Sequence, residues 1–192
     1  MLTSALHVPT KRGLIYTPQA EAVLNLGFAF KKGLGEGISR ANRANMPKVL
    51  VSEGTGNLDK REMATVIEQA FGKRLASGYF DRGDILHIFY YPNYEGLAIV
   101  KQLAGIPYLD KLAVANNAKG IGMGKNLIAE IIDYYYKLLW RASLDNPANC
   151  MYFKACQWTA TVGNWNIYWI NLEMGEILPA LVSASLLEKT IV

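Results

Sequence analysis

Cysteine is scarce in this chain, which has only Cys150 and Cys156 among its 192 residues. Their spacing fits no zinc-binding or redox motif, so we expect two reduced thiols and a reducing compartment. Histidine is equally scarce: His7 and His87 lie eighty positions apart, with no cysteine or carboxylate pattern around them. His87 falls in a strand-like run and is expected to be packed or hydrogen-bonded. The sequence therefore predicts no metal site.

Long hydrophobic runs are also lacking, since no apolar stretch reaches 18 residues, and we expect no membrane-spanning helix. The net charge of +4 is uneven: residues 1–50 hold seven Lys and Arg against two Asp and Glu, and the remainder is nearly balanced. A nucleic-acid-binding surface would need a basic stripe with interleaved aromatic residues on the folded body, which the pattern does not offer. With 51% hydrophobic residues, the chain is expected to form one globular domain.

The first 30 residues are weakly patterned and are expected to form an N-terminal arm. Thr3–Gly13 contains no acidic residue, as in a transit-type leader, but a flexible arm or the remnant of an upstream domain is the favoured interpretation. The glycine-rich stretch Lys31–Ile38 has no convincing strand before it and lacks the ending of a P-loop, which favours a linker.

Helix and strand patterns alternate through the rest of the chain. A helix that starts at Asn57 or Asp59 and runs through Gln69 is followed by Gly72, which suits its C-terminus. A short helix is expected near Ala76–Phe80, and the tail 177–192 has the spacing of a packing helix. Strands are expected at 49–51, 85–91, 94–103, 107–114, 137–142, 157–161 and 165–171, with a strong turn at 145–149. This order predicts an α+β fold with a central antiparallel meander.

The stretch Pro107–Lys125 reads as a strand, a polar loop, a glycine-rich turn and the start of a helix. Glycines at alternate positions remove side chains from a turn, so that backbone N–H groups close on an anion next to the positive end of the helix. The glycines follow a meander instead of a first strand, which argues against a dinucleotide-binding βαβ unit. The sequence therefore predicts a phosphate site of another kind.

The run Lys119-x-x-Gly122-x-Gly124 resembles the coenzyme A-binding signature Gln/Arg-x-x-Gly-x-Gly/Ala of GCN5-related acetyltransferases. Residues 31–172 as a whole resemble the acetyltransferase domain of N-acetyl-L-glutamate synthases of the vertebrate and fungal type, which also occurs in bifunctional synthase/kinases. The resemblance is carried by Tyr108-Leu109-Asp110-Lys111, the glycine loop, Trp140-Arg141, Asp145-Asn146-Pro147-x-Asn149-x-x-Tyr152-Phe153-Lys154 and Trp165-x-x-x-Trp169, in that order.

The resemblance implies the GCN5-related N-acetyltransferase fold, a mostly antiparallel mixed sheet flanked by helices. It implies an acetyltransferase domain over 31–175 with a tail at 176–192, acetyl-CoA as co-substrate, and no metal. The donor would be bound by the strand edge Leu112, Ala113 and Val114 and by the glycine loop, with Lys119, Gly120, Gly122 and Gly124. One backbone N–H of the strand edge would donate to the developing oxyanion.

The acceptor implied is L-glutamate, whose two carboxylates need cations, and the resemblance assigns this role to Lys73, Lys111 and Arg141. Each has an alternative: Lys73 is a common loop lysine, Lys111 could form an ordinary ion pair with Asp110, and Arg141 could extend outward from its strand. Arg141 suits a two-pronged grip on a carboxylate.

Three further residues are candidates for the chemistry. Tyr152 would return a proton to the thiolate or position the substrate, and Tyr108 would lie near the amine. Asn146 would bind substrate, although Asn before Pro is also ordinary turn chemistry. No histidine or carboxylate stands out as a general base, so a base acting through water is expected.

One position departs from the family pattern, which has a second arginine two residues after the first. Here that place is taken by Ser143, and loss of this cation puts glutamate acetylation in doubt. A regulatory module that binds acetyl-CoA or N-acetylglutamate and acts on a kinase-type partner stays open as the rival, and a homo-oligomer is possible. The expected compartment is the mitochondrial matrix for a eukaryotic protein and the cytoplasm for a bacterial one.

Overall fold

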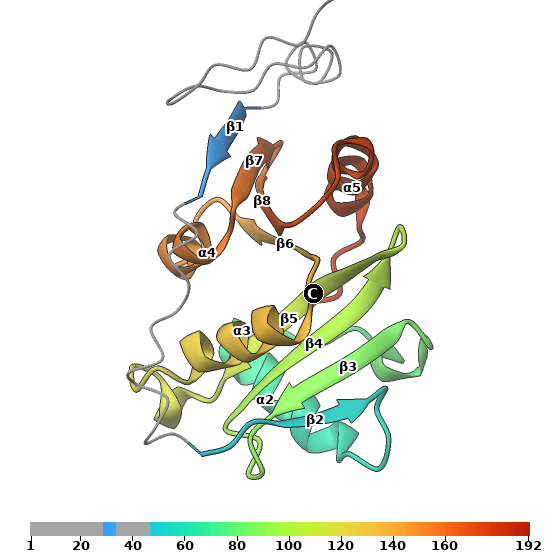
Figure 1. Ribbon diagram of the computed structural model, residues 1–192. Helices are drawn as coiled ribbons and strands as arrows, with labels where there is room; N and C mark the ends of the chain where they lie inside the picture. Colours follow the sequence, from blue (N-terminus) through green and yellow to red (C-terminus); the bar gives the residue numbers. More distant parts are fainter. Residues whose placement is uncertain (1–28, 34–46) are drawn as a thin grey trace, which may run out of the picture.

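The computed structural model describes residues 29–33 and 47–192, which form one sheet flanked by helices (Figure 1). The strand order is β1-β7-β8-β6-β5-β4-β3-β2, and of these neighbours β5 and β6 alone are parallel. This mixed α+β architecture confirms the expected fold class. The strands are β1 (Ala29–Lys32), β2 (Leu50–Glu53), β3 (Ile85–Tyr90), β4 (Gly96–Leu103), β5 (Ile106–Val114), β6 (Leu138–Ser143), β7 (Trp158–Val162) and β8 (Trp165–Ile170). The helices are α2 (Lys60–Phe71), α3 (Met123–Tyr134), α4 (Asn149–Ala155) and α5 (Met174–Leu186), with short 3₁₀ helices at Tyr79–Asp81 and Asn116–Ala118.

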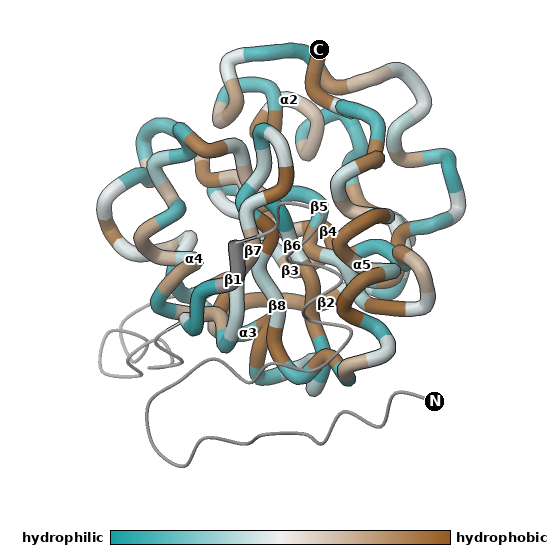
Figure 2. The backbone as a smooth tube through the Cα atoms, turned by 90° about the horizontal axis from the view of Figure 1, so that it is seen from above, coloured by the Kyte–Doolittle hydropathy of each residue, from teal (hydrophilic) through white to brown (hydrophobic). Residues whose placement is uncertain are grey.

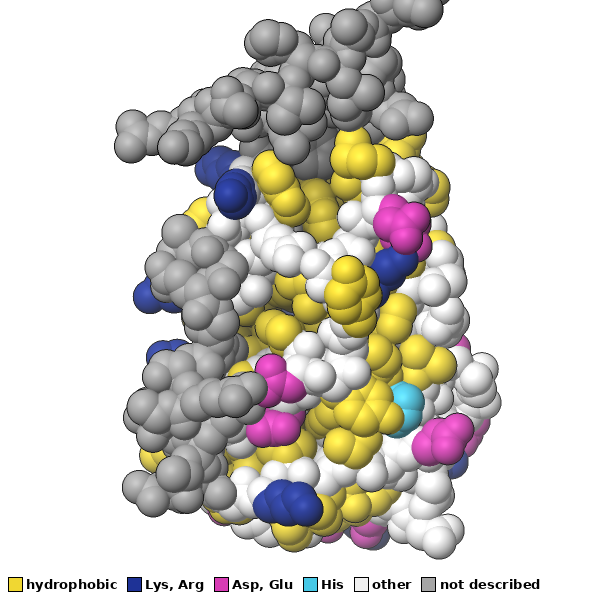
Figure 3. All heavy atoms as spheres, in the orientation of Figure 1, with side chains coloured by type: hydrophobic (Ala, Val, Ile, Leu, Met, Phe, Trp, Pro, Cys, Tyr) yellow, Lys and Arg dark blue, Asp and Glu magenta, His cyan; other side chains and the backbone are white. Residues whose placement is uncertain are grey.

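Alternation along the strands divides the core into two faces. On β4, Leu97 and Ile99 pack with α2, whereas Ala98 and Val100 pack with α3 on the opposite face. Helix α4 shares the α3 face, and α5 covers strands of the α2 face through small residues such as Ala184. The hydrophobic stretches accordingly converge on the sheet at the centre of the molecule (Figure 2), and the α3 side carries hydrophobic side chains on its surface (Figure 3).

The predicted boundaries of α2 follow from its caps. The Asp59 side chain accepts hydrogen bonds from the backbone N–H groups of Arg61 and Glu62 at 2.9 and 3.0 Å. Gly72 ends the helix in the left-handed conformation, with φ 65°, which glycine adopts without strain. The helix continues to Phe71, two residues beyond the expected end.

Three expectations need correction. Lys31 and Lys32 belong to β1, which pairs with β7, and are not part of a linker; the rest of that stretch, from 34 on, lies outside the described residues. The short helix expected near Ala76–Phe80 is a 3₁₀ turn at Tyr79–Asp81. The packing helix expected over 177–192 is α5, Met174–Leu186, and the last six residues lie outside it. In addition, helix α4 was not predicted. The expected arm falls almost entirely within residues 1–28, which are not described, and the division of the chain into arm, domain and tail stays a prediction.

The scarce residues behave as follows. His87 Nδ1 lies 2.5 Å from the Tyr135 hydroxyl and Nε2 lies 3.1 Å from that of Tyr134, so this histidine is hydrogen-bonded as expected. Cys150 is exposed, Cys156 is buried, and both are free thiols. No cluster of three or more metal-ligating side chains occurs in 29–33 or 47–192. Within these same ranges no helix has the length and hydrophobicity needed to cross a membrane.

Candidate active site

The parallel pair β5 and β6 separates after a short contact. Tyr108 lies opposite Leu139 and Leu109 opposite Trp140, and the register of the two strands ends there. Strand β5 continues for five more residues, to Val114, along β4 on its other side. The edge of β5 that faces β6 is therefore open from Asp110 onward, in the part of the chain that the structure describes.

A β-bulge lies at the point of separation. Ile99 of β4 is opposite Lys111, and the next residue, Val100, is opposite Leu109, so that Asp110 is the extra residue on β5. A bulge bends its strand and redirects neighbouring side chains. Consequently Asp110 and Lys111, although adjacent in sequence, both approach Tyr79: the Tyr79 hydroxyl donates to Asp110, and Lys111 Nζ lies 5.2 Å from the centre of the ring.

These residues form a charged cluster with little exposure. Asp110 pairs with Lys111 at 2.9 Å and with Lys101 at 4.0 Å. Burial raises the pKa of Asp110, but Lys111, the Tyr79 hydroxyl and Lys101 outweigh it and hold that pKa below its usual value. Burial also lowers the pKa of Lys111, an effect that Asp110 opposes. The carboxylate is thus kept charged by its partners, and the ion pair foreseen as the alternative role of Lys111 is present.

The glycine loop follows the open edge of β5. Gly120 and Gly122 have φ of 88° and 96°, conformations that residues with a side chain adopt only with strain. Gly122 is the N-cap of α3 and supplies no side chain to cap it, so the first N–H groups of the helix face outward from the loop. A Cβ on Gly124 would lie 3.6 Å from the Val114 side chain. Lys119 and Gly120 are exposed, and this geometry fits a phosphate group.

Leu112, Ala113 and Val114 lie in the open part of β5, as predicted. Ala113 is buried on the α2 face, whereas Leu112 and Val114 pack on the α3 face. The strand edge and the glycine loop are therefore continuous, and both are within the same segment of the chain.

Arg141 and Lys111 both reach the C-terminal part of the chain. The Arg141 guanidinium lies 4.0 Å from the centre of the Trp165 ring and donates to the carbonyls of Ala184 and Leu187. Lys111 donates to the Thr190 hydroxyl at 2.7 Å. The structure thus brings two of the three predicted acceptor-binding cations to one segment, and Arg141 does not extend outward.

The third cation, Lys73, directly follows Gly72 at the end of α2 and its side chain is exposed. Its neighbour Arg74 exchanges backbone hydrogen bonds with Val192. Lys73 is therefore close in sequence to the place where the C-terminal segment docks, but no contact joins it to the other two cations among the residues described.

The two candidate tyrosines are buried. Burial, followed by the charge of Asp110, raises the pKa of Tyr108 well above its usual value, although Arg141 beside it acts in the opposite direction. Burial likewise raises the pKa of Tyr152, which lies on α4 with its ring 6.2 Å from that of Trp140. Both phenols therefore keep their protons at neutral pH.

Asn146 and Ser143 lie in the turn after β6. Asn146 Oδ1 accepts from the Ala148 N–H at 2.8 Å, which is the turn chemistry considered as its alternative role. Ser143 is two residues beyond Arg141 and so points to the same face of β6, opposite Trp165 of β8. A hydrogen bond with Ser143 lowers the pKa of Asp145.

A family model described as the N-acetyltransferase of N-acetylglutamate synthase matches residues 48–185. The chain belongs to this family. The match includes β5, the glycine loop, β6 and α4, and it confirms the resemblance noted in the sequence. Membership assigns acetyl-CoA as the co-substrate of the domain.

Curated proteins are similar in sequence to this N-acetyltransferase domain. They include an acetylglutamate kinase of Xylella fastidiosa, 29% identical over 73% of the chain, and a mitochondrial amino-acid acetyltransferase of Debaryomyces hansenii, 30% identical over 77% of it. A mitochondrial N-acetylglutamate synthase of Danio rerio is 30% identical over 60% of the chain. The aligned region makes up 32%, 27% and 23% of these three relatives, so the domain spans about a third of their length or less.

Among solved structures, the N-acetylglutamate synthase of Neisseria gonorrhoeae complexed with coenzyme A and N-acetylglutamate superimposes with a TM-score of 0.50 at 18% identity. It covers 67% of this chain and 36% of that one. A GNAT-family putative acetyltransferase of Desulfovibrio desulfuricans gives a TM-score of 0.50 at 16% identity, covering 64% and 98%. At these identities the likeness establishes the fold of the N-acetyltransferase domain.

Some residues at the site of the N-acetyltransferase domain were not predicted. Tyr79 and Thr190 contact Asp110 and Lys111 from far along the chain, and neither stands in a pattern that singles it out. Trp165 was noted only as part of the resemblance, although its ring packs on Arg141.

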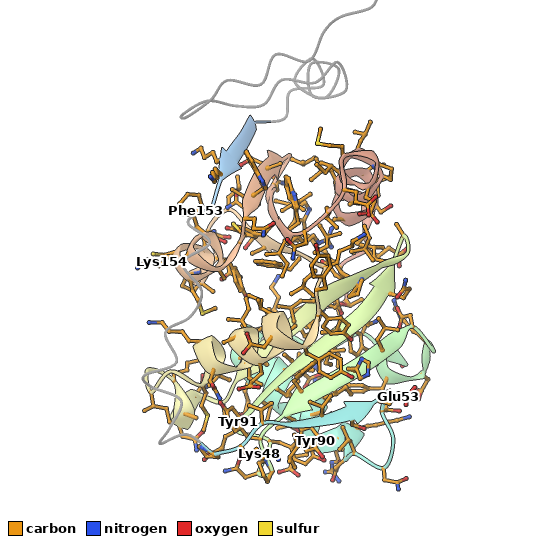
Figure 4. The ribbon with its side chains drawn as sticks, in the orientation of Figure 1. Lys48, Glu53, Tyr90, Tyr91, Phe153 and Lys154 are labelled. Atoms are coloured by element: carbon orange, nitrogen blue, oxygen red, sulfur yellow. The ribbon has the colours of Figure 1, made fainter. Side chains whose placement is uncertain are left out.

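A pocket of about 340 Å³ is lined by residues of α4, β1, β7 and β8. Phe153 lines it, whereas Lys154 points outward from the same helix (Figure 4). None of the predicted site residues is part of its lining, which consists of Lys31, Asn149, Phe153, Thr159, Thr161, Asn166 and Tyr168.

Proposed function

We propose that this domain transfers the acetyl group of acetyl-CoA to the α-amine of L-glutamate, yielding N-acetyl-L-glutamate. The observation that carries the proposal is the separation of β5 from β6 after Leu109 and Trp140. The glycine loop follows the opened strand, and the cations Lys111 and Arg141 lie at the same break. Donor and acceptor residues thus meet along one strand edge, which favours group transfer over simple binding.

On the donor side, backbone N–H groups bind acetyl-CoA and stabilise the charge that develops in the reaction. The N–H groups at the start of α3 and the glycine loop bind the pyrophosphate. A backbone N–H on the open edge of Leu112–Val114 stabilises the charge that develops on the thioester oxygen during attack. Holding both reactants at one edge supplies several kcal/mol of the barrier through orientation alone.

On the acceptor side, cations hold the two carboxylates of glutamate. The Arg141 guanidinium, fixed by stacking on Trp165, presents a planar fork that suits a carboxylate. Lys111 supplies the second charge, and Lys73 a third from the exposed loop after α2. Ser143 leaves the acceptor site with one cation fewer than the family pattern, which weakens binding of glutamate.

Proton transfer falls to a water-relayed base and to tyrosine. The raised pKa values of Tyr108 and Tyr152 make both phenols hydrogen-bond donors at neutral pH, not bases. Tyr152 therefore donates toward the departing thiolate, while Tyr108 positions the amine. Asn146 shapes the turn beside them and offers its amide group to the substrate.

A second function is favoured by one observation. Lys111 and Arg141 are both engaged by the C-terminal part of the chain, and Ser143 replaces an arginine. A domain of this kind that turns over slowly would bind acetyl-CoA or N-acetylglutamate and regulate an N-acetylglutamate kinase. The names of the relatives support such a kinase-type partner and a mitochondrial location if the protein is eukaryotic. Arginine biosynthesis is the pathway that we propose for the product, N-acetyl-L-glutamate.

The proposal is tested by incubating the full chain with acetyl-CoA and each of a panel of amino acids while free thiol is measured. Thiol release with glutamate, well above that with glutamine or no acceptor, is the expected result. If glutamate releases no thiol while calorimetry still detects acetyl-CoA binding, the enzyme proposal fails and the regulatory function remains.

A further inference from the structure

The segment Leu187–Val192 after α5, called the strap below, holds both cations that lie at the break in the sheet. Thr190 accepts the 2.7 Å hydrogen bond from Lys111 Nζ, 79 positions away in sequence. Arg141 Nη2 donates to the Leu187 carbonyl at 2.9 Å, and Nη1 donates to the Ala184 carbonyl in the last turn of α5. The strap therefore takes one hydrogen bond from each cation, while the end of α5 takes another from Arg141 and Asp110 the rest from Lys111.

The far end of the strap is attached to the loop after α2. Arg74 N–H donates to the Val192 carbonyl at 3.0 Å, and Val192 N–H donates to the Arg74 carbonyl at 2.9 Å. Ala76 N–H donates to the Thr190 carbonyl at 2.9 Å, and Leu75 and Ile191 form an antiparallel bridge. The strap thus runs from Arg141 past Lys111 to the loop that carries Lys73, across the residues proposed to bind acceptor carboxylates.

The partners that the strap offers are neutral oxygens. Arg141 forms no salt bridge with a carboxylate among the residues described, and Lys111 shares Asp110 with Lys101. Hydrogen bonds from a cation to a carboxylate are shorter and about twice as strong as those to neutral oxygens. A ligand with two carboxylates is therefore well suited to displace the strap from these cations.

The strap is held less firmly than the core. Glu188, Lys189 and Val192 are exposed, Leu187 and Ile191 are only partly buried where they pack against the core, and its sheet pairing consists of a single bridge. Segments with few buried contacts open at a small fraction of the free energy of global unfolding. By contrast, α5 before it is anchored by buried residues such as Leu181, so the strap can leave while the helix stays in place.

We propose that the strap is an intramolecular competitor of the acceptor, which closes the acceptor site by engaging Lys111 and Arg141. This inference rests on the proposed function, since it assigns the same cations to the acceptor. Only the fraction of molecules with the strap released binds acceptor, so the apparent affinity for acceptor falls by that fraction. Binding of acetyl-CoA at the glycine loop is unaffected.

The first test removes one strap contact. Thr190→Val keeps the shape of the side chain but deletes the hydroxyl that binds Lys111. The KM for glutamate should fall roughly tenfold, as expected for loss of a hydrogen bond to a charged group in the closed form. The KM for acetyl-CoA should not change, and Lys189→Ala, at an exposed strap position, serves as the matched control. An unchanged or higher KM for glutamate in Thr190→Val would overturn the proposal.

The second test fixes the strap in place. Arg74 and Val192 exchange two hydrogen bonds, so the adjacent pair Leu75–Ile191 is of the closely spaced kind that suits a disulfide. In a Cys150→Ser background, Leu75→Cys/Ile191→Cys should lose at least about tenfold in N-acetylglutamate formation when oxidised. A reductant should restore it, with product measured by mass spectrometry. Full activity in the oxidised form would overturn the proposal.

Failure of the proposed function is recognised separately. If no variant acetylates any acceptor, the enzyme proposal fails, and the strap is then judged by calorimetric binding of L-glutamate in the presence of coenzyme A. Tighter binding to Thr190→Val than to the unaltered chain, with none to the oxidised disulfide form, supports the strap. Equal binding, or equal absence of binding, in all forms overturns it.

Discussion

Leu109 lies opposite Trp140, and this is the last pair at which β5 and β6 run side by side. Beyond it, the extra residue Asp110 bends β5 along β4 and leaves its other edge open. The glycine loop follows the opened strand, and the two engaged cations, Lys111 and Arg141, directly follow the break on β5 and β6. The predictions below separate its donor side from its acceptor side.

The donor side is tested at Gly122. Gly122→Ala forces a side chain into a left-handed conformation, with φ 96°, at the first turn of α3, so the KM for acetyl-CoA should rise by about tenfold or more, while that for glutamate stays nearly constant. Gly105→Ala is the matched control, because Gly105 has a similar φ of 81° in the β4–β5 turn. Both variants should lose about 1–2 kcal/mol of stability. Equal effects of the two on the KM for acetyl-CoA would contradict a donor role for the loop.

The acceptor side is tested at Ser143. Ser143→Arg adds a cation on the same face of β6 as Arg141, so kcat/KM for glutamate should rise by roughly tenfold, the effect of one charge-assisted hydrogen bond. Steady-state thiol release with glutamate and glutamine measures the change. Ser143→Ala controls for loss of the hydrogen bond to Asp145 and should leave the ratio of the two acceptors as it is. If Ser143→Arg gives no gain, this position does not limit glutamate binding.

The next prediction tests whether the Tyr152 hydroxyl donates a proton to the departing thiolate. Because burial raises its pKa well above neutrality, Tyr152→Phe should lower kcat by about 10²-fold without adding or removing an inflection in the pH–rate profile between pH 6 and pH 9. Tyr168→Phe is the control, since this buried tyrosine donates to Asn149 and stacks on Trp140. A kcat that is the same in both variants would show that Tyr152 acts only through packing.

Asp110 links the buried cluster to stability. The pKa of Asp110 is lower in the folded chain than in the unfolded one. Its contribution to the free energy of unfolding is therefore complete at pH values above the pKa of the unfolded state, and it is lost as pH falls through the pKa of the folded state. Asp110→Asn removes one partner of a buried ion pair and leaves Lys111 uncompensated, which should cost about 3 kcal/mol at pH 7. The difference from the unaltered chain should shrink below about pH 4, where the carboxyl group of the unfolded chain takes up its proton. Urea unfolding at several pH values measures it.

Asp81→Asn provides the comparison for that experiment. Asp81 forms an exposed ion pair with Lys60, with side chains 69% and 47% exposed, so its removal should cost less than about 1 kcal/mol. If Asp110→Asn behaved like Asp81→Asn at pH 7, the cluster around Asp110 would not be a stabilising one.

Much of the fold follows from local pattern, and the rest depends on contacts between distant segments. Short apolar or β-rich runs bounded by turns predict β3 to β6, alternation predicts β7 and β8, and the caps Asp59 and Gly72 predict α2, because these signals are contained within each element. Helix α4 has seven residues and no side-chain cap, so no local signal marks it. Lys31 and Lys32 form a strand by pairing with Thr159 and Trp158 of β7, which lie far away in the sequence.

The same distinction applies to the site. The glycine loop is recognisable because the signature proposed to bind the donor consists of residues close together in the sequence. The engagement of Lys111 by Thr190 and of Arg141 by Leu187 depends on how the end of the chain folds back, and no spacing in the sequence indicates it. The predicted roles of the site residues, from the cations and tyrosines to the glycine loop, stay predictions. Lys73 is exposed, and Asn146 and the two tyrosines have structural roles that are compatible with either outcome.

The most direct test of acetyl transfer to glutamate is detection of the product. The full chain is incubated with acetyl-CoA labelled in the acetyl group and with L-glutamate, and N-acetyl-L-glutamate is followed by mass spectrometry. Labelled N-acetyl-L-glutamate should accumulate in proportion to the protein present, and more slowly in Arg141→Ala. If no labelled product forms while acetyl-CoA binds, the domain is not a glutamate acetyltransferase.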